Sequence, residues 1–256
     1  MTMETILNTI IQRHKAGQKS IAVLIDPDKV QHPDELRVVI KIANENYVDY
    51  FFVGGSLITN SSLPDIINLI KSQSSIPVLL FPGSNMQIDN DADGLLLLSL
   101  ISGRNPDLLI GQHVIAAPIL KNSGLEIIST GYMLIDGGST TSVVYMSNTL
   151  PIPSEKYSIA TSTAMAGEML GNQLIYMDAG SGAANSINSK MINAVREAVN
   201  IPLIVGGGIN SSLKAMNALQ SGADIIVIGN AAEKNPNLLI EVSNTIYDFN
   251  KSLDIH

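Results

Sequence analysis

Eight short apolar runs, separated by segments with helical patterns, constrain the fold of this chain most strongly. Each run is rich in β-branched and aliphatic residues, as expected of parallel strands buried on both faces. Because no flexible linker or composition shift interrupts the alternation, we predict one α/β domain over residues 1–256, a (β/α)8 TIM barrel. The predicted strands are Ile21–Ile25, Tyr50–Val53, Pro77–Phe81, Gly94–Leu98, Glu126–Ile135, Leu174–Met177, Leu203–Val205 and Ile225–Ile228. The predicted helices are Met3–Lys15, Pro33–Asn46, Pro64–Ser72, Pro106–Lys121, Thr161–Leu170, Ser189–Val199, Ser211–Ser221 and Asn235–Phe249.

Two connections depart from the regular pattern. Residues 82–93 contain a proline, a glycine, two asparagines and three aspartates, and they show no apolar period. A crossover helix with its loops usually needs this whole length or more, so we predict that a loop or extended segment replaces the third helix. The long polar segment Asp136–Ser158 follows the fifth strand, and we interpret it as a mobile lid or interface segment.

Composition excludes several classes of protein. The formal net charge of −8 argues against a nucleic-acid surface, which needs a basic stripe. The chain has no cysteine, which excludes disulfides, zinc–thiolate sites and thiol catalysis. We find neither a signal-peptide pattern nor a window of about 20 apolar residues that could span a bilayer. A cytoplasmic location is therefore the expectation.

Glycines follow the last two predicted strands. The first group is Gly206-Gly207-Gly208, and the second is Gly229, followed by Asn230. In a (β/α)8 barrel the loops after the last two strands commonly bind a phosphate through backbone N–H groups. The sequence therefore predicts a phosphorylated small-molecule ligand.

Polar residues follow other predicted strands. Asp26 and Ser56 offer oxygen atoms that suit Mg²⁺, although an Asp-Pro-Asp sequence also commonly caps a turn. Asp178 ends a buried strand before a run of small residues, and its carboxylate could act as a general base toward a substrate hydroxyl. The structural alternative for Asp178 is that it caps the segment that follows.

At these residues the sequence resembles the geranylgeranylglyceryl phosphate synthase family, which includes the related bacterial heptaprenylglyceryl phosphate synthases. The resemblance covers nearly the whole chain and is closer to the second of the two family groups. The segments that carry it are Leu24–Lys29, Val53–Ser56, Ser129–Tyr132, Tyr176–Gly182, Val205–Ile209 and Gly229-Asn230.

The resemblance implies transfer of a geranylgeranyl or similar long prenyl group from its diphosphate to the 3-hydroxyl of sn-glycerol 1-phosphate, with Mg²⁺ as cofactor. Asp26 and Ser56 would be the metal ligands, and Asp178 and Tyr132 would lie at the reacting atoms. An apolar groove over the barrel would take the prenyl tail. The glycerol phosphate site would comprise Tyr176, Met177, Asp178, Ala179, Gly180, Ser181, Gly182, Gly207, Gly208, Gly229 and Asn230.

One residue departs from the family pattern, because Asp178 stands where the family usually has glutamate. The carboxylate would reach about 1–1.5 Å less far, on a scale where about 1 Å can change a rate a hundredfold. This departure keeps open a catalytically impaired binding protein for the same ligands. Another phosphate-binding barrel, such as a sugar-phosphate isomerase or lyase, also stays open, because the two C-terminal glycine loops are not specific to prenyl transfer.

The chain is also expected to form a homo-oligomer and to contact the membrane surface peripherally to obtain a lipid substrate. The apolar segments Pro106–Lys121 and Thr161–Leu170 are candidate interfaces, but a core-facing stripe is the simpler explanation for either. No basic amphipathic helix marks a membrane-binding surface.

Overall fold

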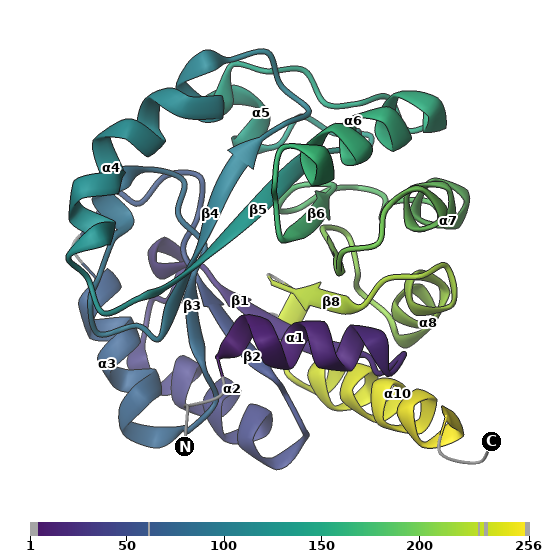
Figure 1. The fold of residues 1–256 in the computed structure, drawn as a ribbon. Coiled ribbons are helices and arrows are strands. Elements are labelled where there is room, and N and C mark those ends of the chain that lie inside the picture. Colours follow the sequence, from purple (N-terminus) through teal and green to yellow (C-terminus); the bar gives the residue numbers. More distant parts are fainter. Residues whose placement is uncertain (1–4, 61, 230, 233–234, 254–256) are drawn as a thin grey trace.

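The computed structural model describes residues 5–60, 62–229, 231–232 and 235–253. Its strands are all parallel and close into a barrel in the order β1 to β8, with the helices around it (Figure 1). The predicted barrel is thereby confirmed. The strands are β1 Ser20–Ile25, β2 Tyr50–Val53, β3 Val78–Leu80, β4 Gly94–Leu100, β5 Glu126–Leu134, β6 Leu174–Asp178, β7 Leu203–Gly206 and β8 Ile225–Ile228. The α-helices are α1 Ile6–Lys15, α2 Pro33–Glu45, α3 Leu63–Gln73, α4 Gln112–Lys121, α5 Ser142–Ser147, α6 Tyr157–Met169, α7 Ser189–Ala198, α8 Ser212–Gln220 and α10 Asn237–Leu253.

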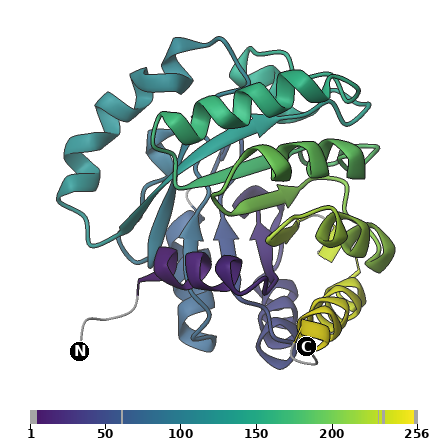
Figure 2. The ribbon, with the colours of Figure 1, turned by 45° about the vertical axis from the view of Figure 1, so that its right-hand side comes forward.

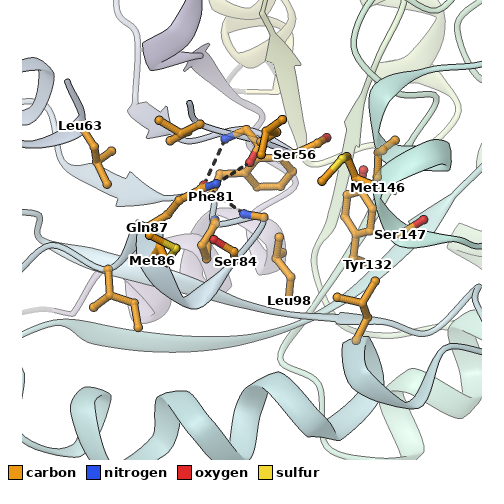
Figure 3. Close-up of a pocket in the computed structure, with 18 of the residues that line it drawn as sticks. Ser56, Leu63, Phe81, Ser84, Met86, Gln87, Leu98, Tyr132, Met146 and Ser147 are labelled. Carbon is orange, nitrogen blue, oxygen red and sulfur yellow. Dashed lines mark hydrogen bonds between the residues drawn. The ribbon is translucent and has the colours of Figure 1, made fainter. Parts of the chain in front are cut away.

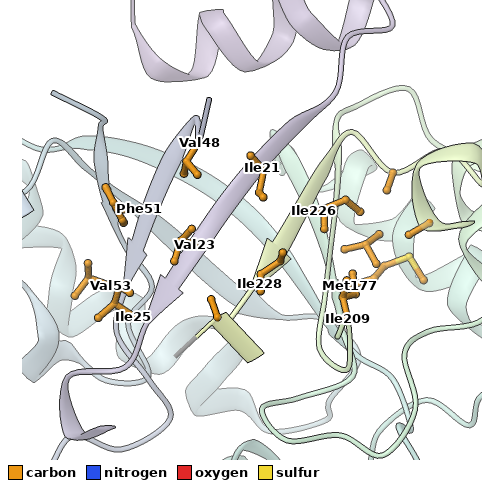
Figure 4. Packing of buried hydrophobic residues seen from close by; sticks show 14 of the residues in the cluster. Ile21, Val23, Ile25, Val48, Phe51, Val53, Met177, Ile209, Ile226 and Ile228 are labelled. Carbon is orange, nitrogen blue, oxygen red and sulfur yellow. The ribbon is translucent and has the colours of Figure 1, made fainter. Parts of the chain in front are cut away.

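Side chains of each strand alternate between two apolar layers. On β1, Ile21, Val23 and Ile25 face outward and pack in the cluster under the helices, whereas Ala22 belongs to the cluster inside the barrel (Figure 4). Successive side chains of a strand point to opposite faces, so this parity continues to the strand ends. Asp26, four residues after Ala22, therefore lies at the inner mouth of the barrel.

The third connection lacks an α-helix, as predicted. Between β3 and β4 the chain makes one 3₁₀ turn, Asn85–Gln87, and otherwise follows an irregular path. The layer of helices around the barrel is consequently open on this side.

In the fifth connection the predicted start of the helix was wrong, whereas the role of the segment as a lid or interface stays a prediction. The segment Asp136–Ser158 contains the short helix α5, and Ile135 and Ile152 form an isolated parallel bridge. It also contains the start of α6, which begins at Tyr157 rather than Thr161. Sequence patterns missed this start because the N-cap residue, Lys156, makes no side-chain capping bond.

Other boundaries also differ from the prediction, and two of these differences are informative. The helix predicted over Pro106–Lys121 is divided into a π-helical turn, Asp107–Gly111, followed by α4. Strand β4 continues through Ser99 to Leu100 because it pairs with β5 along its whole length. Propensity alone does not reveal such pairing, which depends on a partner strand more than twenty residues away.

Helix α1 lies across the end of the barrel where the strands begin (Figure 2). The Glu126 carboxylate, at the start of β5, accepts hydrogen bonds from the backbone N–H groups of Ile6 at 2.7 Å and Leu7 at 2.8 Å. These bonds satisfy donors that a helix N-terminus leaves without intrahelical partners. With this end closed, the opposite end of the barrel is left for ligands. Among the described helices, none combines the length and apolarity needed to cross a membrane.

Candidate active site

Two adjoining cavities open at the C-terminal ends of the strands. We call the first, of about 620 Å³, the polar cavity, because the glycine loops and carboxylates line it. We call the second, of about 520 Å³, the apolar groove. The residues common to both linings are Gly55, Ser56, Leu57, Phe81, Tyr132 and Val143. A ligand with a charged head and an apolar tail could therefore occupy both at once.

The polar cavity brings together most of the predicted site residues. Those that line it are Asp26, Ser56, Tyr132, Tyr176, Asp178, Gly180, Ser181, Gly182, Gly207, Gly208 and Gly229. Met177 and Ala179 do not line it, because their buried side chains lie in the outer apolar cluster, as the alternation along β6 requires. The predicted residue Asn230 lies outside the described residues.

Asp178 and Tyr132 form a buried pair inside the mouth of the barrel. The Tyr132 hydroxyl donates to Asp178 Oδ2 at 2.5 Å, and the Gly180 N–H donates to Oδ1 at 2.8 Å. Burial raises the pKa of Asp178 above its ordinary value, and these two hydrogen bonds offset the effect only in part. Burial and the neighbouring carboxylate raise the pKa of Tyr132, so it stays protonated and acts as a donor.

Tyr132 belongs to a cluster of three aromatic rings. Phe81 and Tyr132 have ring centroids 5.9 Å apart, Phe81 and Tyr176 5.2 Å, and Tyr132 and Tyr176 5.5 Å. Tyr132 and Tyr176 meet edge to face. Aromatic faces of this kind stabilise positive charge close to them. Phe81 was not predicted as a site residue, because a phenylalanine at the end of an apolar run has the pattern of a core residue.

The glycine loops after β6 and β7 lie in backbone contact. Gly207 has φ +79°, and a Cβ there would lie 2.7 Å from the backbone nitrogen of Ala179 and 2.7 Å from Asp178 Oδ1. Gly180 has φ +88°, and a Cβ there would lie 2.5 Å from the Thr141 hydroxyl. Only glycine fits these conformations and distances. The loops thereby leave a cavity lined by backbone, of the kind that binds a phosphate.

Asp26 lies across the cavity from these loops. Its Oδ2 is 3.0 Å from Lys29 Nζ, and its Oδ1 accepts from the Asp28 N–H at 3.2 Å. Lys29 also donates to the Ser181 hydroxyl at 3.0 Å, so its ammonium group connects the loop after β1 to the loop after β6. Lys29 was not predicted as a site residue, because a single lysine after a strand has no pattern that indicates a function. Asp28 has a structural role, because its carboxylate accepts from the N–H and hydroxyl of Thr59.

The oxygen donors here fit a magnesium ion shared with a phosphate ligand. Asp26 lines the cavity with a side chain that is 19% exposed, and Ser56 lines the same cavity. Among the described residues, no three or more His, Cys, Asp or Glu side chains gather to form a self-sufficient metal site. Mg²⁺ commonly binds through one or two carboxylates and completes its coordination with substrate phosphates and water. The donor set matches that arrangement.

The apolar groove runs from this point under the open side of the barrel (Figure 3). Phe81 and Leu98 form its wall on the barrel side, and Leu63 of α3 and Met146 of α5 lie on opposite sides of it. Met86, on the 3₁₀ turn, is 92% exposed at its rim. The groove occupies the side where the third connection lacks a helix, so the irregular connection creates it.

Fold and site together define a (β/α)8 barrel with glycine loops beside an apolar groove. The profile of the PcrB family matches residues 13–246, and the chain belongs to this family. It is 53% identical over 246 residues to the geranylgeranylglyceryl phosphate synthase of Spirosoma linguale, covering 96% of this chain and 98% of that protein. It is 40% identical over 213 residues to the enzyme of that name from Thermococcus gammatolerans, covering 83% of each chain.

A solved structure shows the same architecture with a ligand. It is the (S)-3-O-geranylgeranylglyceryl phosphate synthase of Thermoplasma acidophilum in complex with its substrate sn-glycerol-1-phosphate. The TM-score is 0.90 at 30% sequence identity, covering 96% of this chain and 100% of that one. The resemblance seen in the sequence is thereby confirmed.

Proposed function

We propose that this protein transfers a geranylgeranyl or similar long prenyl group from its diphosphate to the 3-hydroxyl of sn-glycerol 1-phosphate. The observation that carries the proposal is the junction of the polar cavity and the apolar groove at Ser56, Phe81 and Tyr132. A prenyl diphosphate has a charged head and an apolar tail, and the two cavities match its two parts. The relatives described above carry the name of this activity.

Each substrate has a place in this arrangement. The phosphate of glycerol 1-phosphate would lie against the glycine loops after β6, β7 and β8, where backbone N–H groups are available. The prenyl tail would lie along the apolar groove, and its diphosphate near Asp26, Ser56 and Lys29. The reacting carbon would then be next to Tyr132 and Asp178, where the cavities meet.

The reaction forms one bond and breaks another. The 3-hydroxyl oxygen of the glycerol attacks the first carbon of the prenyl chain, and the bond from this carbon to the diphosphate oxygen breaks. Asp178 takes the hydroxyl proton, and the electron pair of the broken bond leaves with the diphosphate. Positive charge that develops on the allylic carbon faces the rings of Phe81, Tyr132 and Tyr176.

We further propose Mg²⁺ as the cofactor, held by Asp26 and Ser56. When bound, the ion would neutralise negative charge on the departing diphosphate. Lys29 supports this role from the protein side, because its ammonium group lies beside Asp26 and would interact with the same phosphates.

Asp178 is compatible with the role of base despite its short side chain. Tyr132 and Gly180 fix its two oxygen atoms, so the carboxylate has one orientation facing the cavity. If the glycine loops hold the acceptor hydroxyl close to this fixed carboxylate, the shorter side chain can still take its proton. Such positioning can supply much of a rate enhancement.

The test is a transfer assay with geranylgeranyl diphosphate and Mg²⁺, offering sn-glycerol 1-phosphate and sn-glycerol 3-phosphate separately. We expect product from the 1-phosphate, little from the 3-phosphate, and loss of turnover when a chelator removes the metal. Absence of product from both acceptors, with binding of glycerol phosphate retained, would instead support a binding protein.

A further inference from the structure

Gln87 is a buried polar side chain that lines the apolar groove and contacts the loop after β2. It ends the 3₁₀ turn that stands in place of a helix after β3, and only 3% of it is exposed. Its amide oxygen accepts from the Gly83 N–H at 3.0 Å and from the Gly55 N–H at 3.4 Å. Its amide nitrogen donates to the Gly55 carbonyl oxygen at 2.9 Å (Figure 3). One side chain thus binds two loops.

The loops that Gln87 joins lie in direct backbone contact. A Cβ at Gly83 would be 2.4 Å from the Gly55 carbonyl oxygen and 2.9 Å from the Ser56 Cα. Gly54 has φ +149°, and a Cβ there would be 2.1 Å from the Phe81 carbonyl oxygen. Because glycines remove the side chains at this contact, Gln87 supplies the side-chain hydrogen bonds across it.

The loop after β2 leads directly to the predicted diphosphate site. A Cβ at Gly55 would lie 3.2 Å from Asp26 Cγ, so this residue packs against the carboxylate. Ser56 is the next residue and lines both cavities. Any displacement of Gly55 would therefore move the Ser56 hydroxyl relative to Asp26.

We propose that Gln87 is a positioning residue for the prenyl diphosphate: it fixes the loop of residues 54–56, so that Ser56 and Asp26 keep the separation that binds the charged head. This inference rests on the proposed function and assigns to Gln87 a role in one substrate's affinity. It also links the groove wall to the diphosphate site, because Met86 and Ile88, on either side of Gln87, line the groove.

The glycerol phosphate site depends on other loops. Its glycines follow β6, β7 and β8, and none of the described hydrogen bonds of Gln87 reaches them. A change at Gln87 should therefore affect the two substrates unequally. A side chain that only filled the core would lower stability without such selectivity.

The variant to test is Gln87→Met, which keeps the length of the side chain and removes its hydrogen bonds. We expect the KM for geranylgeranyl diphosphate and the Mg²⁺ concentration for half-maximal rate to rise about tenfold, since several hydrogen bonds to the loop are lost. The KM for glycerol 1-phosphate should change less than about twofold, since its loops are untouched. The affinity for inorganic pyrophosphate in the presence of Mg²⁺, measured by calorimetry, should fall by the same factor as the affinity for geranylgeranyl diphosphate.

The matched control is Asn85→Leu. Asn85 belongs to the same turn, but its amide donates to the carbonyl and side-chain oxygens of Gln112 at 3.1 and 2.9 Å rather than to the β2 loop. We expect this variant to lose stability without a selective change in either KM. Should Gln87→Met fail to fold, Gln87→Asn retains an amide that is too short to bind both loops, and the same measurements apply to it.

Equal changes in the two KM values, or no change, would overturn the proposal, as would the same selective change in Asn85→Leu. If the parent protein transfers no prenyl group, the proposed function fails, and pyrophosphate binding then decides the inference alone. Weaker binding by Gln87→Met than by the parent would support it, whereas equal binding, or none by the parent, would overturn it.

Discussion

Two features of the surroundings of Asp178 shift the pKa of its carboxyl group in opposite directions. Burial inside the barrel mouth raises its pKa, while the Tyr132 hydroxyl and the Gly180 N–H favour the ionised form. Burial prevails, so the group binds a proton more readily than an ordinary aspartate. Such a shift toward the working pH is typical of a general base.

The variant Asp178→Asn separates catalysis from binding. The amide has nearly the same shape and can still accept from Gly180, so we expect the affinity for glycerol 1-phosphate to change little. Turnover should fall by about 10²–10⁴-fold, the usual contribution of a general base. Single-turnover rates and calorimetric titrations of parent and variant would check this, and equal rates would remove Asp178 from the role of base.

The direction of the pKa shift sets the pH dependence. Because the pKa of Asp178 is higher in the folded than in the unfolded state, protonation of this group favours folding. This contribution to stability is fully present below the ordinary pKa of aspartate. It is lost as the pH rises through the pKa of the folded state. At neutral pH the ionised carboxylate therefore lowers the stability of the fold, and Asp178→Asn should have a melting temperature no lower than that of the parent.

The same shift predicts the pH dependence of activity. The acid limb of kcat/KM in the parent should lie above pH 3.8, the ordinary pKa of aspartate.

Sequence patterns predicted single site residues better than the contacts between them. Asp178 and Tyr132 were each identified, but their hydrogen bond joins residues 46 positions apart and depends on the register of β5 with β6. Gln87 was not identified at all, because a glutamine in a polar loop has no pattern until the fold buries it. Met177 was placed in the glycerol phosphate site with its neighbours, although strand alternation puts its side chain outside the barrel.

At the scale of elements, the loops after β6 and β7 form one unit. They meet backbone to backbone at Gly207, so we expect Gly207→Ala to disrupt both. A methyl group would collide with the Ala179 nitrogen and with Asp178 Oδ1. The KM for glycerol 1-phosphate should rise at least about tenfold, because about 1.4 kcal/mol of lost binding gives this factor.

A matched control separates the collision from backbone strain. Gly171, after α6, has φ +93° and no atoms within 4 Å of a Cβ. Gly171→Ala should therefore cost only the strain of a left-handed backbone, about 1–2 kcal/mol of stability, with unchanged kinetics. If both variants lose affinity equally, the contact between the loops is not what binds the phosphate.

Elements with strong periodicity were predicted well, and those defined by their partners were not. The runs that became β2 and β8 matched the structure residue for residue. The helix after β3 was correctly predicted to be absent, since its segment was too short and too polar. The start of α6 and the π-helical turn before α4 carry no capping signal or period, so their positions follow from packing.

For the whole molecule, α4 presents apolar side chains on both of its faces. Ala116 and Leu120 are buried toward the barrel, whereas Val114 is 64%, Ile115 60% and Ile119 51% exposed. A core-facing stripe therefore accounts for only part of this segment. A helix that is apolar all round usually has its second face covered too.

We expect a second copy of this chain to cover this face. The net charge of −8 disfavours an anionic membrane surface as the alternative partner. By analytical ultracentrifugation the parent should be a dimer or larger, and Ile115→Glu should shift it toward the monomer. Val38→Glu, at a 50% exposed apolar position on α2, should leave the assembly unchanged. A monomeric parent that binds lipid vesicles would assign the face to the membrane instead.

Because no α-helix connects β3 to β4, the apolar interior of the barrel continues into the groove on this side. Leu100 belongs to the inner apolar layer and Leu98 packs against it, and both also line the groove. A prenyl tail in that place would complete the layer, so that ligand and protein share a single interior. Binding of the tail would then resemble the last step of folding, because apolar surface of the protein and the ligand leaves water. The heat-capacity change on binding should accordingly be negative, as it is when an apolar core forms.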